Sequence, residues 1–211
     1  MPRPTWLSPV YTIPEEMADK ARLPALGYAS AAEALGEKFH ASAALLQRLN
    51  PGKDLARGRT DRGAQCAGHR AAAQGRKIVV DKSERTLTLL DTACKQTGRP
   101  VSFFVRHRQG SAADRQLESQ WHIEESRLPL QPQAVLGRQP GRAKATIPVS
   151  PNNPVGVAWI DLSKPHYGIH GTPIPGTIGK TQSHGCIRLT NWDVMAVTES
   201  VGPGTDVLMQ E

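Results

Sequence analysis

Residues 183–189 of this chain read Ser183-His184-Gly185-Cys186-Ile187-Arg188-Leu189. From Cys186 onward the run alternates as a strand does, which predicts that Ile187 and Leu189 enter the core. Cys186 and Arg188 then share the opposite face. Gly185 lets the backbone bend and lets a substrate carbonyl come close, because it has no Cβ. A thiol in this setting is typical of acyl-transfer chemistry, which needs a base for the thiol proton and donors for a developing oxyanion.

Two histidines compete for the role of base. His184 lies two residues from Cys186 and leans alongside it, whereas His170 ends a predicted strand at 167–170 and can approach from a neighbouring strand. Sequence spacing does not decide between them. The amide N–H groups of Gly185 and Cys186 can form an oxyanion hole. A zinc site of His170, His184 and Cys186 is the other interpretation, but structural zinc ligands usually cluster in CxxC or HxxxH pairs, which the sequence lacks.

Around this motif the sequence predicts a mainly β fold with one helix packed on its C-terminal part. A hairpin signal surrounds the turn at 82–85, because β-type runs lie on both sides of it. Thr190 can cap a helix over 191–201, with Asp193 near its positive end and Val194, Val197 and Val201 on one apolar face. The predicted strands are 77–81, 86–90, 101–105, 155–162, 167–170, 187–189 and 206–209.

The N-terminal part is predicted to be helical. Residues 1–28 have no clear period and are interpreted as an extended lead-in. Ser30 followed by Glu33 has the spacing of a capping box, which predicts a helix from Ser30. A second short helix is predicted at 42–49, and Asn50-Pro51-Gly52 ends it. The Arg-, Gly- and Ala-rich residues 59–75 are interpreted as a linker.

Four segments resemble the YkuD-type L,D-transpeptidase family. They are Asn152-Asn153-Pro154-Val155-Gly156, Trp159-Ile160, Tyr167-Gly168-Ile169-His170-Gly171-Thr172 and the run 183–189 quoted above. The likeness is dense over 145–211 and recognisable over 77–90. It implies a mainly β fold, a YkuD-like β-sandwich or barrel with a packed C-terminal helix, preceded by a small α-helical segment.

The resemblance also implies roles for individual residues. Cys186 would be the nucleophile, His170 the base, and the Gly171 carbonyl would orient the imidazole. The oxyanion hole and pocket would be formed by Ser183, His184, Gly185 and Arg188. The candidate substrate-binding residues are Tyr167, Thr172 and Trp159, although the residue type and position of Trp159 favour a core residue over a substrate platform.

The reaction that the resemblance implies is transpeptidation of peptidoglycan. Cys186 would attack a stem tetrapeptide, release its terminal D-alanine and pass the acyl group to an amine of a second stem, giving a 3→3 cross-link, or to a lysine of a lipoprotein. No metal or cofactor is implied, and carbapenems would acylate the same cysteine. Alternatives are an L,D-carboxypeptidase or other cysteine hydrolase, and a degraded, inactive member that only binds the cell wall.

The helical segment at 29–58 resembles an incomplete LysM module, a glycan-binding unit with a β-α-α-β plan. The predicted organisation is thus a lead-in at 1–28, this module, a linker at 59–75 and a catalytic domain at 76–211. Residues 91–142 are atypical of the family, because the turn that usually builds one wall of the site is not recognisable there.

Charge and cysteine content bear on partners and location. The net charge is +7, and residues 59–145 alone carry 16 Lys/Arg against 8 Asp/Glu. No aromatic interleaving or recognition-helix pattern accompanies this excess, so nucleic acid is not an expected partner. Attraction to anionic wall polymers needs only the charge, and a solvated Arg-rich surface is the alternative. The odd cysteine count, Cys66, Cys94 and Cys186 without a CxxC pair, favours a catalytic thiol.

The resemblance places the chain in the periplasm or cell envelope. No run approaches the roughly 18 apolar residues that a membrane span requires. The pattern of a signal peptide is not visible in residues 1–11.

Overall fold

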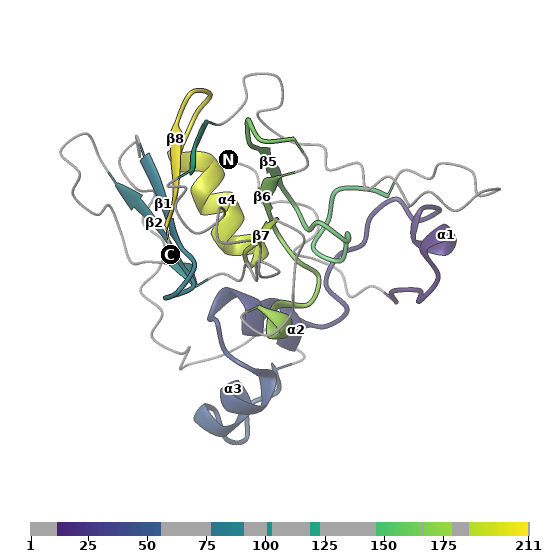
Figure 1. The fold of residues 1–211 in the computed structure, drawn as a ribbon. Coiled ribbons are helices and arrows are strands. Elements are labelled where there is room, and N and C mark those ends of the chain that lie inside the picture. The colour runs from purple at the N-terminus through teal and green to yellow at the C-terminus, as the bar shows by residue number, and fades with distance from the viewer. Residues whose placement is uncertain are drawn as a thin grey trace.

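The computed structural model describes residues 12–55, 77–90, 101–102, 119–122, 147–165, 167–178 and 186–210. Within these ranges two β-sheets enclose the C-terminal helix α4 (Asn191–Ser200), which lies between them in Figure 1. The expected mainly β fold with a packed C-terminal helix is confirmed.

The larger sheet has five strands in the order β3-β2-β1-β8-β4. Its centre is the predicted hairpin, β1 (Lys77–Asp81) antiparallel to β2 (Thr86–Leu90), and β8 (Asp206–Gln210) adds to β1 in parallel. On the outer side of β2 lies β3 (Val101–Ser102), the described part of the strand predicted at 101–105.

The other edge strand, β4 (Ser119–His122), is not among the predicted strands. It pairs with β8 alone, and an edge strand of four residues leaves little periodic pattern to recognise in the sequence.

The smaller sheet contains β5 (Trp159–Asp161), β6 (Gly168–His170) and β7 (Ile187–Arg188), in that order. The prediction of a strand from 155 was wrong at its start, because residues 153–156 form a turn. The Asn153 side chain accepts a hydrogen bond from Val155 N, and Gly156 N donates to the Asn153 carbonyl. Gly156 completes the turn at φ 69°, a left-handed conformation that favours glycine.

One hydrophobic core joins both sheets to α4. As predicted, Ile187 and Leu189 are fully buried in it. Val194 and Val197 of α4 are also buried, and Val201 is half-buried against the same core. This core fixes β6 and β7 side by side, which positions the residues discussed below.

The predicted helix caps are present. Thr190 Oγ1 accepts from Asp193 N at the start of α4, and Ser30 Oγ accepts from Glu33 N at the start of α2 (Ala31–Lys38). Ser42, which was predicted only as the start of a helix, caps α3 (Ala43–Leu49) in the same way. Caps of this kind typically stabilise a helix by about 1 kcal/mol. The described residues 12–30 contain no strand before the helix pair, and residues 56–76, where a closing strand would follow, lie outside the described ranges.

The lead-in differs from the extended segment that was expected. It contains the short helix α1 (Met17–Lys20), and Leu26 and Tyr28 are buried. Leu26 N donates to Ser150 Oγ, and Asn152 N donates to the Leu26 carbonyl. Residues 26–28 therefore pack on the segment that leads into β5. None of the helices in the described part of the chain is long and apolar enough to cross a membrane.

Candidate active site

His170 ends β6, and Cys186 directly precedes β7, the adjacent parallel strand. In the register of β6 and β7, Ile169 is paired with Ile187 and His170 with Arg188. Paired residues on neighbouring strands point to the same face of a sheet, and residues two apart along a strand do too. The face opposite buried Ile187 therefore carries His170, Arg188 and Cys186 together.

The His170 imidazole is held in one orientation. Its Nδ1 lies 2.6 Å from the Gly171 carbonyl oxygen, and because a carbonyl can only accept, Nδ1 carries the proton and Nε2 is left as the acceptor. The Trp159 ring, on the paired residue of β5, stacks on the imidazole at 5.0 Å between centroids and 16° between planes. Trp159 Nε1 donates in turn to Asp161 Oδ1. Trp159 is thus a wall of this site.

Burial keeps the imidazole neutral. His170 is only 5% exposed, and this burial lowers its pKa to about 4, with the positive charge of Arg188 acting in the same direction. The hydrogen bond to Gly171 opposes the shift but does not cancel it. At neutral pH the ring is therefore a neutral imidazole, able to take a proton at Nε2.

Cys186 is a half-buried thiol outside any disulfide. Burial raises its pKa, while a hydrogen bond with the Gly168 main chain and the charge of Arg188 act in the opposite direction. The resting state is consequently a neutral thiol beside a neutral imidazole rather than an ion pair. Such a thiol needs a base at the moment of attack.

The turn after β6 is packed around Asn191. A Cβ on Gly171 would lie 2.3 Å from Asn191 Oδ1, and a Cβ on Gly156 would lie 2.1 Å from the same atom. Asn191 Oδ1 accepts from Val157 N, and its Nδ2 lies 3.3 Å from the Thr172 carbonyl and 3.2 Å from the Pro151 carbonyl. We call this arrangement of Asn191, Gly156, Gly171 and Thr172 the Asn191 junction.

The sequence did not single out Asn191, which appears there only as the first residue of a helix. The sequence signal for this role is an asparagine directly after the cap residue Thr190, because a short amide side chain can form hydrogen bonds with nearby main-chain groups.

The remaining predicted site residues are placed as follows. Thr172 is buried, and its Oγ1 accepts from Ile174 N at 3.3 Å. Tyr167 packs partly against the core, with Lys164 Nζ 4.1 Å from its ring centroid. Ser183, His184 and Gly185 lie outside the described residues. Within the described ranges, no three His, Cys, Asp or Glu side chains gather closely enough to hold a metal ion.

Comparison with known families identifies the domain that contains these residues. The family model of the YkuD L,D-transpeptidase catalytic domain matches residues 75–209, well over half of the 211-residue chain. The chain belongs to the L,D-transpeptidase (YkuD) family. The matched interval begins just before β1 and ends within β8, so it contains both sheets, α4 and the face with His170 and Cys186.

Relatives agree with the family assignment. The chain is 45% identical over 73 residues to the L,D-transpeptidase YkuD of Bacillus licheniformis, which covers 35% of this chain and 39% of that protein. It is 52% identical over 58 residues to the YkuD protein of Bacillus subtilis, covering 28% and 35% respectively. The chain thus spans less than two fifths of the length of these two relatives. A solved L,D-transpeptidase of Mycobacterium smegmatis superposes with a TM-score of 0.42 at 18% identity, over 66% of this chain and 59% of that one.

The low pKa of His170 predicts the pH at which its ring takes up a proton. We expect an NMR titration of the His170 ring to have its midpoint near pH 4, well below the ordinary histidine value of about 6.5. With His170 as the base for Cys186, the role proposed below, acylation of Cys186 should stay on its plateau as the pH falls through 6.5 and decline only as the pH approaches 4, because protonated Nε2 cannot accept the thiol proton. A midpoint near 6.5 would contradict the buried, neutral imidazole described above.

Proposed function

We propose that the chain is an active L,D-transpeptidase that works through a cysteine acyl-enzyme, with Cys186 as nucleophile and His170 as base. The observation that carries the proposal is the pairing of β6 with β7, which puts a neutral thiol and a neutral imidazole with an accepting Nε2 on one face. Family membership supplies the reaction class.

In the first step the Cys186 thiol proton passes to His170 Nε2 as sulfur attacks the carbonyl carbon of the donor's amide. The tetrahedral intermediate then collapses, the C–N bond breaks, and the departing amine of the terminal D-alanine takes the proton from the imidazolium. A thioester on Cys186 remains. Gly171 holds the ring through Nδ1 during both proton transfers, a role that a carboxylate has in the Ser-His-Asp triad.

The oxyanion of that intermediate needs donors. We assign this part to the main-chain N–H groups of Gly185 and Cys186, with Ser183 and His184 shaping the pocket. Arg188, directly opposite His170 in the strand register, is suited to bind a carboxylate of the donor stem. Tyr167, Thr172 and Trp159 complete the substrate side of the pocket in this proposal.

In the second step an acceptor amine attacks the thioester carbon and gives a proton to Nε2. The Cys186 thiolate then leaves and takes that proton back from the imidazolium. With a second stem peptide as acceptor the product is a 3→3 cross-link; a lipoprotein lysine would give an anchored protein. Water as acceptor would make the same site an L,D-carboxypeptidase. Because the proposed substrate is peptidoglycan, the protein would act in the cell envelope. The helical segment at 29–58 would bind the glycan strands there.

The test uses the full chain, a stem tetrapeptide with D-alanine at its fourth position, and an excess of a stem peptide with a free side-chain amine. We expect mass spectrometry to find a product that has lost D-alanine and gained the acceptor. The corresponding tripeptide, which lacks the scissile amide, is the matched control donor and should give no product. Release of D-alanine without transfer would favour the carboxypeptidase, and folded protein that does neither would contradict the proposal.

A further inference from the structure

Helix α2 contributes a buried carboxyl group to the catalytic domain from outside the interval that the family model matches. Glu37 is the one buried residue of α2 and is only 3% exposed. Burying a carboxyl group is costly unless hydrogen bonds replace its water. Here three donors do so, and none of them belongs to α2 itself.

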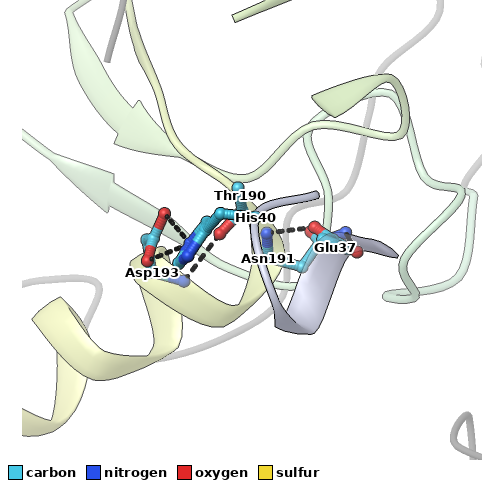
Figure 2. Close-up of polar contacts among 5 residues, drawn as sticks. All are labelled: Glu37, His40, Thr190, Asn191 and Asp193. Carbon is cyan, nitrogen blue, oxygen red and sulfur yellow. Dashed lines mark hydrogen bonds and ion pairs between the residues drawn. The ribbon is translucent and has the colours of Figure 1, made fainter. Parts of the chain in front are cut away.

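Two of these donors belong to Asn191. Its main-chain N–H donates to Glu37 Oε1, and its Nδ2 lies 3.3 Å from Oε2 (Figure 2). The third is the Tyr28 hydroxyl, which donates to Oε2 at 2.6 Å. The carboxyl therefore sits at the first residue of α4, where the positive end of the helix favours negative charge.

A second contact holds the same two helices together. His40, just beyond α2, places Nε2 3.0 Å from both carboxylate oxygens of Asp193 in the first turn of α4 (Figure 2). Asn152 Nδ2 adds a bond to Glu33 Oε1 at 3.1 Å. Helix α2 is thus docked on α4 and on the segment before β5 rather than held at a distance on a linker.

The Asn191 junction carries this contact to the site. Asn191 is 1% exposed, and it lies against Gly171 and bonds the Thr172 carbonyl. The carbonyl of Gly171 is the acceptor for His170 Nδ1. Asn191 therefore lies against the residue whose carbonyl sets the tautomer and direction of the imidazole.

We propose that Glu37 is a positioning residue for the active site, acting through Asn191 on the Gly171 carbonyl and so on His170. The α2 helix is then part of the working enzyme in addition to any glycan contact that it makes. The effect on acylation rests on the proposed function, whereas the effect on the His170 ring does not.

The test compares Glu37→Met with Glu37→Gln in the full chain. Met keeps the length and helix propensity of the side chain but removes both acceptor oxygens, while Gln keeps one acceptor for Asn191 N–H. We expect Glu37→Met to slow acylation of Cys186 by a carbapenem about tenfold to a hundredfold, the size of effect that a small misplacement of a catalytic group produces. Glu37→Gln should recover most of that loss. Glu199→Met, on the exposed face of α4, is the matched control and should behave as the unaltered chain.

The second readout is the nitrogen NMR spectrum of the His170 ring, which is recorded on the folded population whatever its melting temperature. The unaltered chain should have one tautomer, protonated at Nδ1, and Glu37→Met should have a mixture. Slowed acylation with an unchanged tautomer would overturn the proposal, since a merely structural role lowers stability without moving the ring. An unchanged acylation rate together with an unchanged His170 tautomer would overturn the proposal as well. If the unaltered chain fails to react with the carbapenem, the proposed function loses support and the tautomer alone decides the role of Glu37.

Discussion

Replacing Cys186 by alanine should abolish the covalent adduct that a carbapenem forms with this chain. The sulfur is the only atom that the proposed mechanism uses to bond the acyl group, so no partial activity is expected from the neighbouring His170. For comparison, loss of a hydrolase nucleophile costs on the order of 10⁶ in kcat. Intact-mass spectrometry should find the unaltered chain shifted by one inhibitor molecule and Cys186→Ala unshifted.

The matched controls for this experiment are Cys66→Ala and Cys94→Ala, which replace the other two cysteines and should keep the adduct. Far-UV circular dichroism and a thermal melt of Cys186→Ala should resemble those of the unaltered chain, because alanine leaves Ile187 and Leu189 in the core. An adduct that persists in folded Cys186→Ala would place the reactive group elsewhere and refute the nucleophile assignment.

Replacing His170 by glutamine should slow carbapenem acylation by about 10²- to 10⁴-fold, the usual contribution of general acid–base catalysis. Glutamine fills much of the same space but has no group that takes a proton near neutral pH. Because burial raises the pKa of the Cys186 thiol, little thiolate is present without that base. The second-order rate constant, followed by mass or fluorescence, measures the loss, and His69→Gln serves as the matched histidine control.

Alkylation by iodoacetamide separates a lost base from a damaged pocket. This reaction needs only a thiolate, which solvent supplies at high pH, and it has no leaving amine to protonate. In His170→Gln the alkylation rate at high pH should therefore stay close to that of the unaltered chain while acylation remains slow. Equal losses in both reactions would mean that the substitution blocks access to Cys186, and would count against the role of base.

Much of the local structure could be predicted from the sequence, because its determinants are close together along the chain. Ser30 and Thr190, the two predicted caps, each accept from a main-chain N–H three residues on. The hairpin β1–β2 and the burial of Ile187 and Leu189 follow from alternation alone. The family resemblance was likewise recognisable from the motifs around His170 and Cys186, since rare residue types recur there at fixed spacing.

Tertiary structure decided what surrounds those motifs. The segment at 155–158 could not extend as a strand, because the Asn153 turn and Gly156 bend it toward Asn191. Trp159, which the sequence favoured as a core residue, stacks on His170 because the pairing of β5 with β6 places the two rings opposite each other.

The contact between Glu37 and Asn191 is the clearest case. It joins residues 154 positions apart, and nothing in the amphipathic pattern of α2 marks the Glu37 carboxyl group as buried. The sequence by itself determined the family and the candidate residues for the chemistry, because caps, alternation and motifs depend on near neighbours. Only the folded chain decided what holds them in place, because hydrogen bonds between distant segments depend on how sheets and helices pack.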